Sequence, residues 1–143
     1  MIKQHVWALI FIGIVCLPSF FLSTVPSFLT AQDKSGKVEI VIRNSTFEFQ
    51  GGILQPNEPG TIVLRNLDKV KHGFTSPLLQ ELDVQVEADD ATTYGKGIKG
   101  IYINPGQTVQ IHFISNRPGR FPFHCDIHPN MKGELLLLAI GAT

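Results

Sequence analysis

The stretch Phe121-Pro122-Phe123-His124-Cys125-Asp126-Ile127-His128-Pro129-Asn130-Met131 carries the clearest structural signal in the chain. Alternate side chains of a β-strand share one face, so we expect Phe121, Phe123 and Cys125 to point together toward a core. His124 then points the other way. The pattern predicts a strand that ends at Cys125 and delivers its thiol inward, where the chain enters a loop.

The loop after this strand contains further side chains that bind metals. His128 and Met131 follow Cys125, and Pro129 between them stiffens the loop by fixing one backbone dihedral. A distant His72, predicted to lie in a loop after an earlier strand, completes a set of one thiolate, two imidazoles and one thioether. Thiolate and thioether suit Cu(I), whereas imidazole tolerates both oxidation states, so this set favours a mononuclear copper site that moves electrons.

The rest of the sequence is patterned as strands. Val38, Ile40 and Ile42 alternate with Glu39, Val41 and Arg43, the period expected of a sheet with one buried face. Comparable signals lie at 47–49, 61–66, 82–87, 100–103, 108–114, 121–125 and 134–140, with turn sequences such as Asn104-Pro105-Gly106 between several of them. We predict an all-β fold, an antiparallel sandwich of seven or eight short strands, without a convincing amphipathic helix or an internal repeat.

The N-terminal part of the chain has the composition of an export signal. The segment of residues 1–5 is short and contains one basic residue, Lys3, and residues 6–22 are almost wholly apolar. Small residues near Ala31 predict cleavage there, so that residues 1–31 are a signal peptide and residues 32–143 are the exported domain. An uncleaved membrane anchor at residues 6–22 is the alternative, although the apolar stretch is slightly short and contains Pro18. Either way we expect a periplasmic or other extracytoplasmic location.

Charge and cysteine content restrict the function. The chain has 12 basic and 12 acidic residues, without the basic stripe that nucleic acid requires, so we expect a small monomeric carrier or binder that does not bind nucleic acid. Cys16 lies in the apolar leader without the small preceding residue of a lipidation site, and we expect it to leave with the signal. Cys125 is then the one thiol of the exported domain, and its His and Met neighbours favour a metal ligand.

At these residues the chain resembles the cupredoxins, the small blue-copper electron-transfer proteins. The resemblance runs from Val38 to Ala142; its markers are Asn66-Leu67-Asp68 before His72, Asn104-Pro105-Gly106-Gln107-Thr108, Pro118-Gly119, and Phe121 to Cys125 with His128, Met131 and Gly133. The short ligand loop looks most like that of the amicyanin type. The resemblance implies a Greek-key sandwich that binds one copper, with His72, Cys125 and His128 in a plane and Met131 as a long axial ligand.

Two features depart from the family pattern. In many blue-copper proteins an Asn follows the first His and ties the two ligand loops together, whereas this chain has Gly73. The His72-Gly73-Phe74 run is instead similar to the binuclear copper domain of terminal oxidases. That centre needs further donors where this chain has Pro129, Gly133 and Leu136, so the sequence excludes it.

Two other histidines have to be considered as ligands of a second metal. In copper nitrite reductases and multicopper oxidases, a His that precedes the copper cysteine, as His124 does here, can bind another copper. Catalysis there needs more histidines, and the exported part offers only His112, which alternation directs away from the core. We therefore expect no enzyme activity, and interpret His124 as a half-exposed residue or as a candidate electron port next to Cys125.

The segment from Glu81 to Asp90 contains five acidic residues and no basic one. Its simplest interpretation is a solvated sheet edge, and the alternative is a docking patch for a cationic redox partner. Taken together, the sequence predicts an exported carrier that cycles between Cu(II) and Cu(I) and exchanges electrons with a cytochrome, an oxidase or a reductase. A copper-trafficking or storage protein with the same donors and a more open site is the alternative function.

Overall fold

The computed structural model describes residues 36–89 and 91–139, so the predicted leader, Cys16 and the predicted cleavage site lie outside the described residues. The described elements are β1 (Gly36–Arg43), β2 (Thr46–Gly51), β3 (Pro59–Asn66), β4 (His72–Thr75), α1 (Pro77–Gln80), β5 (Asp83–Ala88), β6 (Ala91–Lys96), β7 (Gly100–Ile103), β8 (Thr108–Ile114), β9 (Gly119–His124) and β10 (Lys132–Leu137). No helix in this part of the chain has the length and apolar character needed to cross a membrane.

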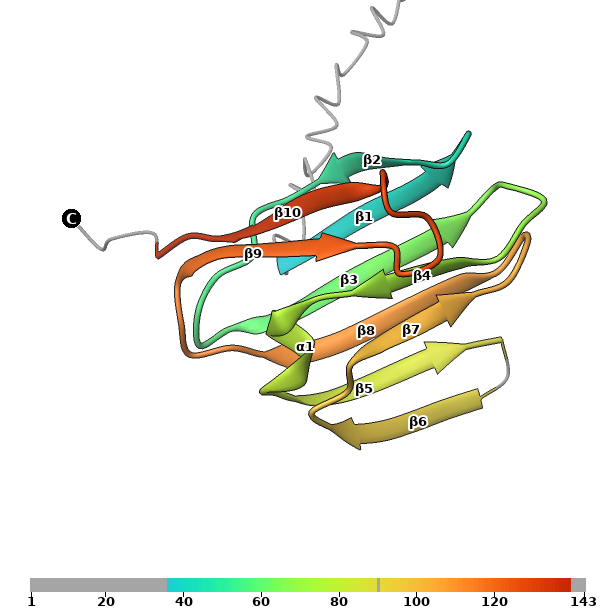
Figure 1. Ribbon diagram of the computed structural model, residues 1–143. Helices are drawn as coiled ribbons and strands as arrows, with labels where there is room; N and C mark the ends of the chain where they lie inside the picture. The colour runs from blue at the N-terminus through green and yellow to red at the C-terminus, as the bar shows by residue number, and fades with distance from the viewer. Residues whose placement is uncertain (1–35, 90, 140–143) are drawn as a thin grey trace, which may run out of the picture. The chain divides into compact units, whose positions relative to one another are not determined.

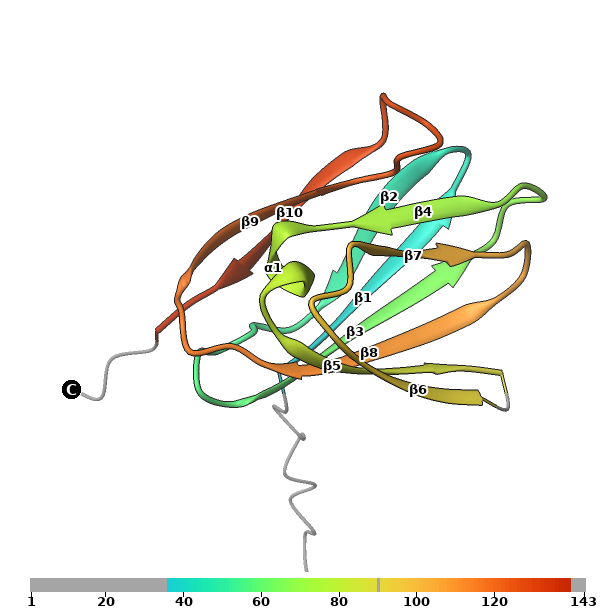
Figure 2. The same ribbon diagram turned by 60° about the horizontal axis from the view of Figure 1, so that its bottom comes forward.

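The strands form two sheets that pack face to face. One sheet has the order β2-β1-β3-β8-β5-β6 and the other the order β10-β9-β4-β7 (Figure 1). Figure 2 presents them as two layers, with α1 at the point where the chain leaves β4 and returns to the larger sheet. The chain changes sheet repeatedly between β3 and β9, which is how a Greek-key sandwich places strands that are distant in sequence next to one another.

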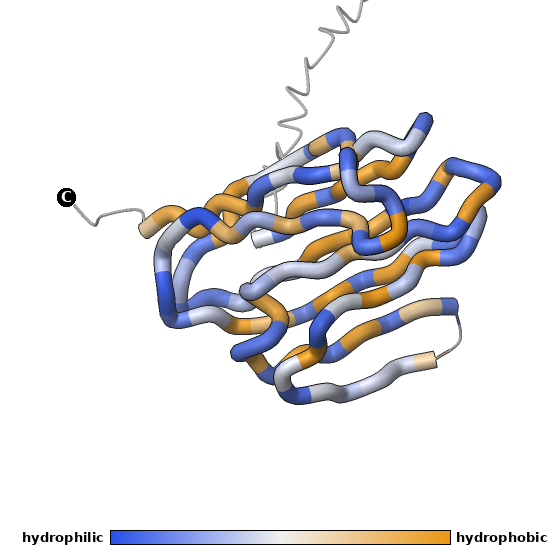
Figure 3. The backbone as a smooth tube through the Cα atoms, viewed as in Figure 1, coloured by the Kyte–Doolittle hydropathy of each residue, from blue (hydrophilic) through white to orange (hydrophobic). Residues whose placement is uncertain are grey.

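The core lies between the sheets and follows from the alternation of apolar residues. Val38, Ile40 and Ile42 of β1 point inward, as do Val109, Ile111 and Phe113 of β8, and all six are buried. Apolar segments accordingly recur along the strands in Figure 3. Phe74 and Phe123, the two largest fully buried side chains, face each other across the β4–β9 boundary with ring centroids 4.9 Å apart. This apolar packing holds the two sheets together next to the site described below.

The fold class predicted from the sequence is confirmed, with three differences in detail. The described residues contain ten strands, and the prediction missed β4 and β6. No residue of β6 is fully buried and β4 has only four residues, so neither gives a clear period-two signal. In addition β1 and β3 pair in parallel, while the other strand pairs are antiparallel.

The prediction that residues 81–90 form an edge of the sheet is wrong. β5 lies between β8 and β6, so that β6 forms the edge. The acidic side chains are also spread along the strand and have different neighbours. Glu81 pairs with Arg117 beyond one end of β5, whereas Asp89, beyond the other end, accepts a hydrogen bond from Gln107. The segment therefore does not present a single acidic patch.

Candidate metal centre

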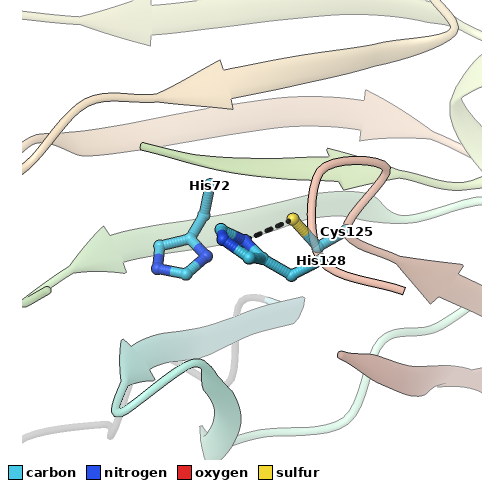
Figure 4. A group of neighbouring side chains, drawn as sticks. All are labelled: His72, Cys125 and His128. Carbon is cyan, nitrogen blue, oxygen red and sulfur yellow. Dashed lines mark hydrogen bonds between the residues drawn. The ribbon is translucent and has the colours of Figure 1, made fainter. Parts of the chain in front are cut away.

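Three of the predicted ligands converge at one end of the smaller sheet. The ligand atoms of His72, Cys125 and His128 all lie within 4.8 Å of one another (Figure 4). Within residues 36–89 and 91–139, no other group of three His, Cys, Asp or Glu side chains comes together in this way. His72 is the first residue of β4, Cys125 follows β9, and His128 lies in the loop between β9 and β10.

The placement of His72 corrects the sequence prediction. The predicted loop position is wrong, because His72 begins β4 and pairs with Ile103 of β7. Because β4 and β9 are neighbours in one sheet, all three side chains come from adjacent chain segments of that sheet. A strand position holds the His72 backbone more rigidly than a loop would.

Cys125 is fully buried, as the alternation Phe121, Phe123, Cys125 predicted. Its Sγ atom accepts a hydrogen bond from the Gly73 backbone N–H at 3.1 Å and lies 3.5 Å from Nδ1 of His128. A backbone donor aimed at the sulfur stabilises the anionic thiolate, which is the form that binds metals.

His72 is also fully buried, and its two ring nitrogens are in different environments. Nε2 lies 2.9 Å from Oδ2 of Asp68, and the charged carboxylate can only accept, so Nε2 carries the proton and donates it. Nδ1 is then an acceptor, and it is buried with no hydrogen-bond partner. A buried acceptor without a hydrogen-bond partner destabilises the folded state. A metal ion bound at Nδ1 would satisfy it, and a carboxylate that holds the far nitrogen is the usual support of a histidine ligand.

Asp68 is held in place by three donors. Besides His72, the backbone N–H groups of Asn44 and Ser45 donate to its two oxygens at 2.7 and 2.8 Å. Burial raises the pKa of Asp68, but the hydrogen bonds from Ser45, Asn44 and His72 together outweigh it and bring the pKa below its usual range. The carboxylate thus stays charged and links the β1–β2 turn to the imidazole.

The buried side chain of Asn66 organises the loop that leads into β4. Its amide nitrogen donates to the carbonyl oxygens of Val70, Ile103 and Asn104 at 2.8, 3.1 and 3.1 Å. Its oxygen accepts the N–H of Asp68 at 3.0 Å. One amide therefore ties the β3–β4 loop to the end of β7 and sets the position of Asp68.

The loop between β9 and β10 closes on itself. The N–H of Cys125 donates to the Met131 carbonyl, and the N–H of Met131 donates to the His128 carbonyl, both at 3.0 Å. His128 is partly exposed, and its ring centroid lies 4.6 Å from that of His72. Met131 is buried at the base of the loop next to Cys125, a location compatible with the predicted axial role, which stays a prediction.

The two remaining histidines lie outside the group. His124 is exposed on the outer face of the smaller sheet, adjacent in sequence to Cys125. His112 points away from the core, as predicted, but is half buried, and its Nδ1 lies 3.0 Å from Oγ1 of Thr61. Neither belongs to a second cluster of metal ligands in the described part of the chain.

Sequence reasoning missed the residues that support the ligands. Asp68 and Asn66 were recognised only as part of a family marker, and Asp126 and Tyr102, whose side chains are hydrogen-bonded to each other, were not singled out. The spacing of Asp68 four residues before His72 is the one local signal, and it is weak. The other contacts join segments that are far apart in sequence.

The site thus combines one buried thiol and two imidazoles, with Nδ1 of His72 and Nδ1 of His128 turned toward the sulfur region. Soft and intermediate donors in this combination fit copper. Burial of Cys125 and His72 excludes water from that side, whereas His128 reaches the surface.

Comparisons with known proteins agree with this description. Residues 10–137 match the family model of the cupredoxin-like domain. The iron transport multicopper oxidase FET3 of Kluyveromyces lactis is 28% identical over an alignment of 144 positions, and the match covers 87% of this chain and 22% of that protein.

Solved structures are similar in fold. The copper nitrite reductase from Nitrosomonas europaea has a TM-score of 0.53 at 10% identity and covers 74% of this chain and 49% of its own. The multicopper oxidase from Campylobacter jejuni has a TM-score of 0.50 at 10% identity, and the match covers 71% of this chain and 29% of the oxidase chain. This chain spans less than half the length of each of these three relatives.

Proposed function

The chain belongs to the cupredoxin-like domain family, and on that premise we propose that it is a mononuclear copper protein that carries electrons. His72, Cys125 and His128 would hold the metal, with Met131 as a proposed fourth ligand, and one copper would be bound per chain. The buried, unpartnered Nδ1 of His72, facing a buried thiol, is the observation that supports this proposal most strongly.

Bound copper would supply a centre that takes up and releases one electron. The chain's own residues keep the donors in place through both states: Asp68 orients His72, the Gly73 N–H stabilises the sulfur, and the loop bonds between Cys125 and Met131 fix the spacing. Donors that are already positioned limit rearrangement when the charge changes, which favours rapid electron exchange. Met131 and the apolar wall around the sulfur would tune the potential.

Electrons are proposed to enter and leave through His128, the partly exposed ligand. Around the same end of the molecule, Leu67, Val70 and Ile127 are exposed apolar residues, and Lys69 and Lys71 lie in the same loop as Leu67 and Val70. This combination supports docking of a redox protein, such as a cytochrome, an oxidase or a reductase, with acidic groups near its own centre. It replaces the acidic segment 81–90 as the proposed contact surface.

Export is part of the proposal and rests on sequence. The apolar segment at residues 6–22 supports a periplasmic or extracytoplasmic location, with the segment either removed or retained as an anchor. A single exported thiol bound to copper would also be protected from disulfide formation.

Copper trafficking and enzymatic oxidation are the competing functions. Trafficking needs an open site from which metal can be handed over, whereas Cys125 and His72 are fully buried and Met131 is 3% exposed. Enzymatic oxidation needs a second, substrate-binding metal, whereas the described residues hold one cluster of ligands. Both observations favour the carrier.

The test is to titrate the protein with Cu(II) while recording visible absorption and electron paramagnetic resonance. We expect one copper per chain, an intense thiolate-to-copper absorption band and a narrow copper hyperfine splitting. Cys125→Ser should abolish the band, and Cys16→Ser should leave it unchanged. Tight Cu(I) binding without the band would overturn the carrier in favour of trafficking, and a second copper with turnover of a substrate would favour an enzyme.

A further inference from the structure

A row of three residues crosses the outer face of the smaller sheet next to Cys125. Tyr102 of β7 pairs directly with Gly73 of β4, and Thr75 pairs with His124 in the antiparallel arrangement of β4 and β9. Two positions further along, Asp126 therefore lies beside Gly73. Tyr102 Oη donates a hydrogen bond to Oδ2 of Asp126 at 2.5 Å, so the side chains of the outer two residues meet over the middle one.

Gly73 is enclosed on both sides. On the inner side its N–H donates to Sγ of Cys125 at 3.1 Å, and on the outer side a Cβ atom would overlap Oδ1 of Asp126. A side chain at position 73 would therefore require the Asp126 carboxylate to move away from its place over β4.

Apart from the Gly73 N–H bond to Sγ of Cys125, the remaining bonds of the ligand loop do not anchor it to β4. The bonds from Cys125 to Met131 and from Met131 to His128 are internal to the loop, and β4 pairs with β9 at the single position Thr75–His124. Within the described residues, the Tyr102–Asp126 bond is the one side-chain hydrogen bond from loop residues 126–131 to another strand. Lys71, with Nζ 6.0 Å from the Tyr102 ring centroid, adds a weak attraction that favours the position of the ring.

We propose that Tyr102 and Asp126 are positioning residues that form a clasp over Gly73 and hold the Cys125–Met131 loop against the strand that carries His72. The clasp joins β7 to the ligand loop and crosses β4 at Gly73, the residue next to His72. Its effect on copper rests on the proposed function; its effect on the loop does not. The Asp126 carboxylate also places a negative charge beside the sulfur ligand, which favours Cu(II) over Cu(I).

The first test needs no metal. In the metal-free full chain, Cys125 is fully buried, so alkylation by iodoacetamide reports opening of the loop. We expect Tyr102→Phe, which removes one hydrogen bond at an exposed side chain, to speed alkylation roughly fivefold. Mass spectrometry of the peptide that contains Cys125 keeps the signal separate from Cys16. Tyr94→Phe is the matched control, because Tyr94 is 75% exposed on β6 and lies away from the loop.

A second comparison separates the hydrogen bond from the charge. Asp126→Asn retains an oxygen that accepts from Tyr102 but has no charge, so it should raise the reduction potential while alkylation stays slow. Asp126→Ala removes both the hydrogen bond and the charge. The double variant Asp126→Ala with Tyr102→Phe should therefore differ little from Asp126→Ala alone in its alkylation rate and reduction potential. Additive effects of Asp126→Ala and Tyr102→Phe would overturn the clasp.

The outcomes distinguish the clasp from the proposed function. Equal alkylation rates for wild type and Tyr102→Phe, with a normal copper spectrum in the wild type, would overturn the clasp and leave the carrier intact. A wild type without the thiolate-to-copper band, together with faster alkylation of Tyr102→Phe, would overturn the carrier and support the clasp as a structural link.

Discussion

At the scale of single residues, the chemistry of the site depends on which nitrogen of His72 is left free. Asp68 accepts the proton on Nε2, and Nδ1 is thereby available as a ligand. Without a fixed acceptor, the proton would divide between the two nitrogens and part of the population would be unable to bind metal.

Replacing Asp68 by Asn should therefore weaken copper binding without unfolding the domain. We expect affinity to fall about tenfold, the lower end of the usual effect for a residue that supports a metal ligand. Competition with a Cu(I) chelator of known affinity measures the change. Asp83→Asn, an exposed residue on β5, is the control, and an unchanged affinity for Asp68→Asn would contradict the assigned role.

Tyr102 should make stability depend on pH in the alkaline range. Its hydrogen bond to Asp126, the nearby Asp126 charge and partial desolvation raise the pKa of Tyr102 above 10.0. The folded state therefore keeps its proton where the unfolded state loses it. The associated stability is present below about pH 10 and is lost as pH rises through the folded-state pKa.

Denaturant unfolding of the metal-free protein at a series of pH values on both sides of that range tests this. As the pH rises from about 10 through the folded-state pKa of Tyr102, the free energy of unfolding of the wild type should fall more steeply than that of Tyr102→Phe. Tyr94→Phe should show the same dependence on pH as the wild type. Parallel slopes for wild type and Tyr102→Phe would show that the bond is not formed in solution.

At the scale of elements, the β3–β4 loop is held by one buried amide. Asn66 bonds to carbonyls at Val70, Ile103 and Asn104, which belong to the loop itself and to the end of β7. The loop has few apolar contacts of its own, because Leu67 and Val70 are exposed. Its order, and with it the position of Asp68, therefore depends on hydrogen bonds.

Asn66→Ala should destabilise the protein by about 3 kcal/mol, because it removes a buried amide whose donors satisfy the buried Ile103 carbonyl and the partly buried carbonyls of Val70 and Asn104. Urea unfolding of the metal-free protein measures the loss, and Asn116→Ala, at an exposed position, should change it little. If Asn66→Ala matched the wild type, water or another donor would have to replace the amide.

At the scale of the whole molecule, we expect folding not to require the metal. The apolar core includes residues from both sheets, and the proposed site lies at one end of it. Copper would join β4 to the β9–β10 loop, adjacent parts of one sheet, so it adds stability to a domain that is already folded.

The metal-free protein should accordingly have a β-type far-ultraviolet circular dichroism spectrum and a cooperative thermal transition. Copper present at about a thousand times its dissociation constant should add about 4 kcal/mol and raise the melting temperature. Chelation should reverse the rise, and Cys125→Ser should show much less of it. A metal-free protein without cooperative unfolding would contradict this expectation.

Local alternation of apolar residues was enough to predict the sandwich, most of its strands and the inward direction of Cys125. The resemblance in short motifs pointed to His72 and His128, and the structure brings them together with Cys125. Local patterns could not reveal β4 or β6, since one is too short and the other is not buried.

The contacts that support the proposed ligands are seen only in the folded molecule. Each of three contacts joins segments that are distant in sequence: the contact of Asp68 with the β1–β2 turn, the bonds from Asn66 to β7, and the bond between Tyr102 and Asp126 over Gly73. Such contacts depend on which strands become neighbours, and that is set by how the two sheets pack, which no local pattern records. Cys125, His128 and Met131 can thus be proposed as ligands from the sequence, whereas the contact of Gly73 with the Asp126 carboxylate is found only in the folded protein.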